Sequence, residues 1–301
     1  MKLENPFPFL MDKQSVYLQS IQESYPDFDI GSARLHPDEG QFNDILIINE
    51  KYVFRFPKHP PGVELLLNES RILEKIRSRL PLPIPDPIYI SQDRQAGKVF
   101  AGYPMLPGEP LWRETLEGIP DEDTLQRLAD QLAGFLKELH SIPIAEAGAD
   151  LPVHETREQW AALYHDIQQH LFDRMRPEAR DGIQDIFEEY LAHPRSYAFQ
   201  PAFRHGDFGP SNILFDRQTR RISGILDFAF AGPGDPAVDL AAVSNYGEPF
   251  VKRFSIIYPE IEAMWGRMRF YKSTFALQEA VYGYHAGDRK ALENGLEDFI
   301  L

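Results

Sequence analysis

The amino-acid pattern changes character about a third of the way along the chain. Before residue 103 it favours an antiparallel sheet with one helix, and after residue 108 it favours helices. The segment between these parts contains two prolines and a glycine. Because neither one sheet nor one bundle accommodates both patterns, we expect an α+β chain in two lobes. The predicted division is an N-terminal lobe at 1–102, a hinge at 103–108 and a larger, mainly helical lobe at 109–301.

The first part has the pattern of a small antiparallel sheet. β-Branched and aromatic runs on both sides of Asn49-Glu50-Lys51 predict a hairpin over residues 45–56. Apolar residues at helical spacing predict one helix over 64–80. This helix must end before residues 81–87, because four of those seven residues are proline. Further strands are expected at 33–35, 88–90 and 99–103.

The second part is mostly amphipathic helix. The clearest helix covers 124–140, with Asp121 or Asp123 as its N-cap. Two short apolar runs, 213–215 and 222–228, flank a turn-like segment and predict a β-hairpin embedded among helices. Weaker helical patterns cover 155–173, 179–192 and the chain from 249 onward.

Composition excludes several classes of function. The chain has 301 residues with 31 Lys and Arg against 46 Asp and Glu, a net charge of −15, which argues against a nucleic-acid partner. Cysteine is absent, which excludes disulfides, thiolate nucleophiles and cysteine-ligated zinc. No apolar run is long enough for a membrane span, and the first residues do not resemble a secretory signal, so a cytoplasmic location is expected.

The densest group of polar residues surrounds the embedded hairpin. Asp207 lies on the loop before the hairpin, Asn212 follows five residues later, and Asp227 follows after a further fifteen residues. All three carry side-chain oxygens, which Mg²⁺ prefers together with substrate phosphates. Asn212 and Asp227, at the two ends of one hairpin, could share such an ion, and Asp207 could orient a hydroxyl group. Taken alone, a segment rich in Asp, Asn and Gly is more commonly an ordinary turn.

The order of these motifs resembles the catalytic core of the aminoglycoside phosphotransferase family, whose members are small-molecule kinases related to protein kinases. His205-Gly206-Asp207 with Asn212 resembles the catalytic loop, and Asp227-Phe228-Ala229 resembles the metal-binding triplet, with Ala in place of Gly. The resemblance implies a bilobal protein-kinase-like fold in which Asp207 accepts the hydroxyl proton while Asn212 and Asp227 hold Mg²⁺. The later motif at 234–240 also resembles a family signature, whose carboxylates are expected to brace the catalytic loop.

The N-terminal lobe shares the resemblance. Arg55 lies on the second hairpin strand, where the family places the cation that holds the nucleotide phosphates, and Glu69 of the next helix would fix that cation. Kinases usually have Lys there, but Arg keeps the charge and binds phosphate oxygens with a forked group. In the hinge, Leu106 is expected to donate its N–H to a purine edge, and Tyr103 to line the nucleotide pocket. Three short segments, at 25–28, 56–59 and 80–85, look most like the aminoglycoside 2″-phosphotransferase branch.

The predicted activity is Mg²⁺-dependent transfer of the γ-phosphoryl group of ATP or GTP to a hydroxyl of a small molecule, first of all an aminoglycoside antibiotic. Residues 109–195 hold 19 acids and 8 bases, which would suit a cationic acceptor. However, residues 240–247 are neutral where the 2″ branch tends to carry acids, and this favours a macrolide kinase or a kinase for a sugar or amino alcohol. A catalytically inactive nucleotide-binding module is the third alternative. No substrate-binding residue is assigned.

Other polar residues give weaker signals. The loop at 36–44 is where a kinase would cover the phosphates, but its single glycine, Gly40, is equally typical of an ordinary loop. His140 is expected to pack beside the catalytic loop. His165 and His170 are five residues apart and do not share a helix face, so no metal pair is predicted for them.

Overall fold

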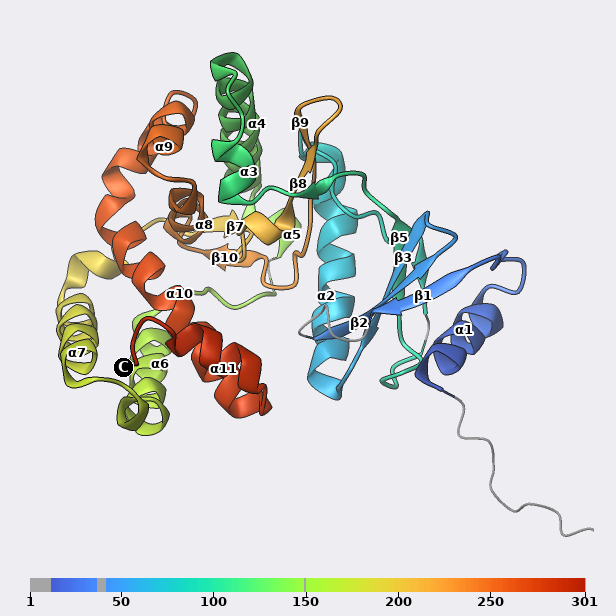
Figure 1. The fold of residues 1–301 in the computed structure, drawn as a ribbon, viewed down its shortest axis with the longest axis horizontal. Coiled ribbons are helices and arrows are strands. Elements are labelled where there is room, and N and C mark those ends of the chain that lie inside the picture. Colours follow the sequence, from blue (N-terminus) through green and yellow to red (C-terminus); the bar gives the residue numbers. More distant parts are fainter. Residues whose placement is uncertain (1–11, 37–41, 92, 149, 301) are drawn as a thin grey trace, which may run out of the picture.

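The computed structural model describes residues 12–36, 42–91, 93–148 and 150–300. Its N-terminal part is a five-stranded antiparallel sheet in the order β1-β2-β3-β5-β4, on the right in Figure 1. All the strands predicted for this sheet are present. Their bounds are β1 Ala33–His36, β2 Asn43–Ile48, β3 Tyr52–Pro57, β4 Tyr89–Ile90 and β5 Ala101–Pro104.

The central hairpin of this sheet has the predicted turn. Strands β2 and β3 pair in a register that sets Ile45 opposite Arg55. Asn49 and Glu50 take left-handed backbone angles, with φ of 56° and 51°, which suit the right-handed twist of a tight hairpin. The hairpin thereby fixes Arg55 on the middle strand of the sheet.

Helix α2 (Pro60–Ile76) begins earlier than the apolar spacing indicated. Two prolines occupy its first turn, where they lose no helical hydrogen bond, and the His59 ring accepts a hydrogen bond from Gly62 N. Leu66 and Leu67, with Val63, pack beneath the sheet, whereas the residues from Ile72 onward join the core of the helical part. The helix therefore connects both parts of the molecule, with Glu69 buried midway along it.

Helix α1 (Lys13–Ser24) is an element that the apolar pattern did not indicate. Asp12 caps it by accepting a hydrogen bond from Ser15 N at 2.9 Å. Only Tyr17, Ser20 and Ile21 of this helix are buried, so its sequence lacks a continuous apolar stripe.

The remainder of the chain is mainly helical, as predicted, with boundaries shifted by a few residues. Helix α4 starts after Asp121, whose side chain bonds the Thr124 hydroxyl instead of a backbone N–H. A capping box of Thr156 and Gln159 starts α6. The helices of this part are α3 Arg113–Glu117, α4 Glu122–Ser141, α5 Ile144–Ala147, α6 Arg157–His170, α7 Pro177–Ala192, α8 Ala237–Val243, α9 Glu248–Phe254, α10 Trp265–Ala286 and α11 Arg289–Leu296. Short 3-10 turns cover Arg77–Arg79, Phe172–Arg174, Pro194–Tyr197, Pro210–Asn212, Ser244–Tyr246 and Pro259–Met264.

Two small antiparallel sheets lie within the helical part. The predicted hairpin is formed by β8 (Ile213–Asp216) and β9 (Arg221–Ile225), and β6 (Glu109–Pro110) pairs with β8. Strand β7 (Ala202–Arg204) pairs with β10 (Gly232–Gly234). The loop between β7 and β8 carries the predicted catalytic motif.

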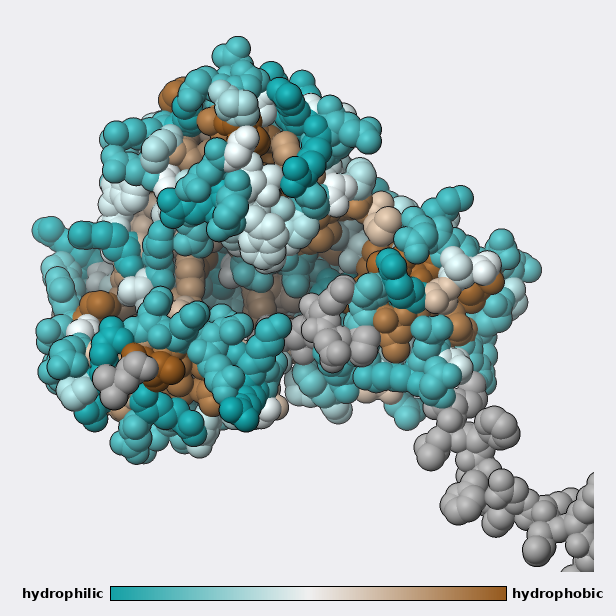
Figure 2. All heavy atoms as spheres, in the orientation of Figure 1, coloured by the Kyte–Doolittle hydropathy of each residue, from teal (hydrophilic) through white to brown (hydrophobic). Residues whose placement is uncertain are grey.

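The whole is an α+β fold of two lobes, as predicted, with the sheet on one side of α2 and the helices on the other (Figure 1). A cluster of seven buried side chains, four of them phenylalanine or tyrosine, forms the core of the small lobe, and a far larger cluster fills the helical lobe. Figure 2 shows the surface hollowed where the two lobes face each other. Among the described residues, no helix combines the length and the apolar character that a membrane crossing requires.

Candidate functional site

The hairpin β8–β9 brings Asn212 and Asp227 to one end of a sheet. Ile213 pairs with Ile225, and the N–H of Leu226 donates to the carbonyl oxygen of Asn212 at 2.8 Å. Asn212 precedes the first strand and Asp227 follows the second, so antiparallel pairing makes them neighbours. Asp227 has a left-handed backbone with φ of 59°, which is uncommon for a residue other than glycine.

Asp207 lies against this end of the hairpin. The side-chain amide of Asn212 donates to both the backbone oxygen and the Oδ2 of Asp207, each at 2.9 Å. Although Asp207 is exposed, the surrounding protein removes part of the hydration of its carboxylate and so raises its pKa, and the charge of Asp227 raises it further. The structure thus brings all three predicted oxygen-bearing residues together.

Asp239 holds the backbone of the loop that carries Asp207. Its Oδ2 accepts the N–H of His205 and its Oδ1 accepts the N–H of Gly206, both at 2.8 Å. The His205 ring completes the loop, since its Nδ1 accepts the N–H of Asp207 at 3.2 Å. Its Nε2 therefore carries the proton that it donates to the carbonyl oxygen of Leu226 at 2.9 Å. These bonds confirm the expectation that a carboxylate of the 234–240 motif braces the loop.

His140 supports Asp239 from the opposite side. Its Nε2 lies 2.9 Å from Oδ2 of Asp239, and its Nδ1 lies 2.8 Å from the Tyr258 hydroxyl. Burial alone would raise the pKa of Asp239, but the hydrogen bond from His140 and the nearby positive charges lower it overall. His140 does lie beside the predicted catalytic loop, and its contact there is with the Asp239 carboxylate, which in turn holds the backbone of the loop.

Asp235, the other carboxylate of the 234–240 motif, was also expected to brace the catalytic loop, and for this residue the expectation is wrong. This buried carboxylate accepts hydrogen bonds from the Tyr271 hydroxyl, at 2.8 Å, and from Arg267, both on α10. Within the described residues, none of its hydrogen bonds reaches the 205–212 loop. Apart from the N–H of Ala237, which Asp235 Oδ1 accepts at 3.0 Å, these side-chain partners lie more than thirty positions away in the sequence, so their contact with Asp235 could not be predicted from spacing.

Arg55 and Glu69 form a buried ion pair next to Asp227. The Nη1 of Arg55 lies 2.7 Å from both carboxylate oxygens of Glu69, and its Nη2 lies 3.6 Å from Oδ1 of Asp227. Burial raises the pKa of Glu69, and the charge of Arg55 opposes this shift. Glu69 also accepts the N–H of Phe228 at 3.0 Å. Helix α2 is thereby tied directly to the segment that holds Asp227, a contact that spans 159 residues and was not predicted.

Tyr103 and Leu106 lie at the junction of the lobes. Tyr103 is buried, and burial raises the pKa of its hydroxyl to about 12 although Arg55 nearby opposes the shift. Leu106 lies over β9, because a Cβ at Gly224 would come within 2.8 Å of its Cδ1. Among the described residues, the Leu106 N–H has no acceptor, whereas the N–H of Met105 donates to Lys51 O at 2.7 Å.

A second buried ion pair, missed by the sequence analysis, supports the loop from β7. Arg204 donates through Nε to Glu155 Oε2 at 3.0 Å, and the same oxygen accepts the N–H of Asp235. Arg204 also donates to the carbonyl oxygen of Phe230 at 2.6 Å. The pair joins residues 49 positions apart, which no spacing rule would connect.

The loop at 36–44 is where a kinase would cover the phosphates. Most of it, with Gly40, lies outside the described residues.

Comparison with known proteins identifies the family. The model of the Phosphotransferase enzyme family matches residues 37–271. The chain is 27% identical to viomycin phosphotransferase of Streptomyces vinaceus over 288 residues, which cover 91% of this chain and 94% of the relative.

Solved structures agree with this match. An aminoglycoside 2″-phosphotransferase in complex with GDP and kanamycin superimposes with a TM-score of 0.85 at 28% identity, covering 93% of this chain and 96% of the other. A macrolide 2′-phosphotransferase of type I shares the fold, with a TM-score of 0.75 at 19% identity over 100% of this chain and 99% of the other. The chain therefore belongs to the phosphotransferase enzyme family and is a small-molecule kinase.

Proposed function

We propose that this kinase transfers the γ-phosphoryl group of ATP or GTP to a hydroxyl of an aminoglycoside antibiotic. The observation that carries the proposal is the cluster of Asp207, Asn212 and Asp227 beside the Arg55–Glu69 pair. In this account, residues 1–102 bind the nucleotide, 103–108 act as the hinge, and 109–301 supply the catalytic loop and the acceptor site. Catalysis would come mainly from positioning and charge neutralisation.

Asn212 and Asp227 are the residues that would hold Mg²⁺. The donor set suits a hard cation, because Asn212 uses its amide nitrogen to bond Asp207 and keeps its amide oxygen as a ligand, while Asp227 adds a partly exposed carboxylate. When bound, Mg²⁺ neutralises charge on the phosphate oxygens. Asp207 would orient the acceptor hydroxyl and take its proton, and its raised pKa suits a proton acceptor.

Arg55, fixed by Glu69, would bind the nucleotide phosphates, while Tyr103 and Leu106 would line the purine pocket. The N–H of Leu106, which has no acceptor among the described residues, is the donor that a purine edge would use. The aminoglycoside 2″-phosphotransferases at 27–28% identity were solved with GDP, which favours GTP as one donor to test.

A cationic acceptor is supported by the acidic composition of residues 109–195. The absence of acids at 240–247 was the feature that favoured a different acceptor. However, all seven residues of α8 are buried, so residues 240–243 belong to the core and do not face an acceptor. The viomycin phosphotransferase match covers nearly the whole chain and makes viomycin the second candidate acceptor.

A nucleotide-consumption screen tests this function. The purified chain would be given ATP or GTP with kanamycin, viomycin, a macrolide and simple amino alcohols, and Asp207→Asn would set the background. We expect acceptor-dependent turnover with a cationic antibiotic. Turnover only with a macrolide or an amino alcohol would overturn the acceptor assignment, and nucleotide binding without turnover on any acceptor would indicate the inactive module.

Removing the guanidinium of Arg55 should weaken nucleotide use. Arg55→Met keeps an apolar stem but loses a charge-assisted contact of about 1.5–3 kcal/mol, so kcat/KM for the nucleotide should fall by about 10- to 100-fold. Arg55→Lys should lose less, because it restores the charge without the fork. Steady-state kinetics against nucleotide concentration measure both variants, and equal losses in the two would contradict a charge-based role.

A further inference from the structure

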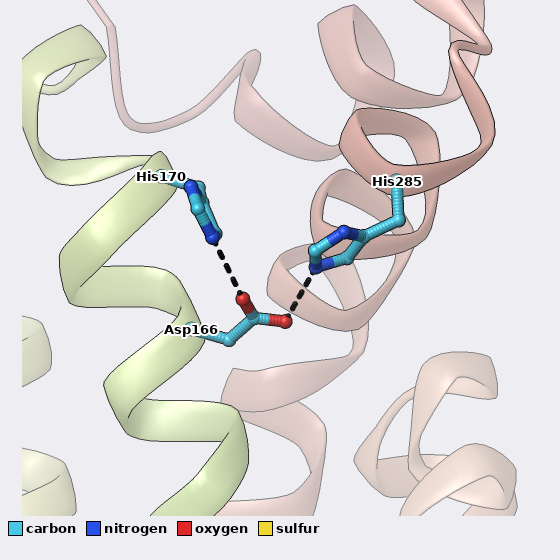
Figure 3. Close-up of side chains that lie close together, drawn as sticks. All are labelled: Asp166, His170 and His285. Carbon is cyan, nitrogen blue, oxygen red and sulfur yellow. Dashed lines mark hydrogen bonds and ion pairs between the residues drawn. The ribbon is translucent and has the colours of Figure 1, made fainter.

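A second group of ligand-type side chains lies between helices α6 and α10 and shares no residue with the candidate active site. Asp166 and His170 are on α6, and His285 is near the end of α10. The Nε2 of His170 lies 3.2 Å from Asp166 Oδ1, and the Nε2 of His285 lies 2.7 Å from Asp166 Oδ2 (Figure 3). One ligand atom from each residue lies within 4.8 Å of the other two.

The fold holds these side chains in place from two directions. Asp166 and His170 share a helix face because they are four residues apart. His285 comes from a segment 119 residues later, brought there by the packing of α10 against α6. The ring of Tyr284 stacks on that of His170 with 4.4 Å between centroids and 19° between planes. The side chains remain between 29% and 53% exposed, so an ion from solvent can reach them.

We propose that Asp166, His170 and His285 bind a divalent transition-metal ion of the zinc type, with water completing its coordination. Two imidazole nitrogens and one carboxylate oxygen suit zinc and its neighbours, whereas Mg²⁺ prefers oxygen ligands alone. Tetrahedral zinc with bonds near 2.0 Å places adjacent ligand atoms about 3.3 Å apart, so the observed spacing needs only small side-chain movements. The site is therefore chemically distinct from the proposed Mg²⁺ site.

To bind zinc, each imidazole would present an unprotonated Nε2 to the ion and carry its proton on Nδ1. The ion would then link α6 to α10 across a long stretch of sequence. Because it binds only when both helices are in place, it would stabilise the folded helical lobe.

The test compares zinc binding in four forms of the full chain, each freed of metal by a chelator. Calorimetric titration with Zn²⁺ in the presence of Mg²⁺ should show one equivalent bound by the unmodified chain. His285→Gln and Asp166→Asn should bind that equivalent at least about 10- to 100-fold more weakly, because loss of a direct ligand costs no less than loss of a residue that only orients one. His165→Gln is the matched control, since His165 is an exposed histidine of α6 outside the cluster, and it should bind as the unmodified chain does.

Melting temperatures provide the second readout. Zn²⁺ should raise the melting temperature of the unmodified chain and of His165→Gln, and at the same concentration should raise those of His285→Gln and Asp166→Asn by clearly less. The metal-free melting temperatures show whether each variant is folded. Because the two substituted ligands lie on different helices, the test can rely on one variant if the other does not fold. Equal zinc affinity in all four proteins, or no saturable binding by the unmodified chain, would overturn the proposal and leave a hydrogen-bonded cluster only.

Discussion

Asp207→Asn should lower kcat by about 10²–10⁴-fold, the usual contribution of a positioned general base, and should leave nucleotide affinity unchanged. The substitution preserves shape, and its amide oxygen can still accept the hydrogen bond from Asn212 that holds this side chain. What it removes is the capacity to take a proton from the acceptor hydroxyl. The loss should therefore appear in the chemical step and not in binding.

Single-turnover kinetics and nucleotide titration separate these two effects. Asp185→Asn is a suitable control, because it makes the same chemical change at an exposed position on α7. If Asp207→Asn loses nucleotide affinity in parallel with turnover, Asp207 is a metal ligand or a structural brace. Unchanged turnover would remove it from the reaction altogether.

Asp239→Asn should reduce the free energy of unfolding by about 3–5 kcal/mol, as expected when one partner of a buried charged network is removed. The carboxylate of Asp239 is fully buried, accepts the N–H groups of His205 and Gly206, and contacts His140. An asparagine has one acceptor oxygen, so its amide N–H₂ must face a backbone N–H. That clash leaves a buried donor unsatisfied.

Chemical denaturation of the unmodified chain and of Asp239→Asn measures the difference in their free energies of unfolding, with Asp185→Asn again as the control. The pKa of Asp239 is lowered in the folded chain, so its ionisation stabilises the fold above the ordinary value of 3.8, and this contribution is lost as the pH falls through the lowered pKa. The stability gap between Asp239→Asn and the unmodified chain should therefore narrow on acidification below 3.8. A gap of less than 1 kcal/mol at neutral pH, the size of a surface substitution, would contradict the bracing role.

Much of the candidate site could be predicted because it is local in sequence. Asn212 and Asp227 flank one hairpin, and pairing of its strands makes them neighbours independently of how the other elements pack. Arg55 lies on a hairpin strand whose turn residues are equally recognisable. Periodicity likewise indicated the long helices, with errors at their ends where prolines and capping side chains decide the boundary.

The contacts that could not be predicted join distant residues. The bond from Phe228 N to Glu69 and the pair of Arg204 with Glu155 depend on how elements pack, and neither leaves a pattern in the sequence. The same holds for Asp166 and His285, whose proximity follows from the packing of α6 against α10. Helix α1 was missed for another reason, since its buried residues are too few to give a helical stripe.

We propose above all that Asp227 and Asn212 hold Mg²⁺ for a nucleotide beside Asp207. Nucleotide titration with Mg²⁺ and with a chelator, in the unmodified chain and in Asp227→Asn, tests it most directly. We expect the unmodified chain to bind ATP or GTP more tightly with Mg²⁺, and Asp227→Asn to lose that advantage while binding the metal-free nucleotide as before. An undiminished Mg²⁺ dependence in Asp227→Asn would contradict the account.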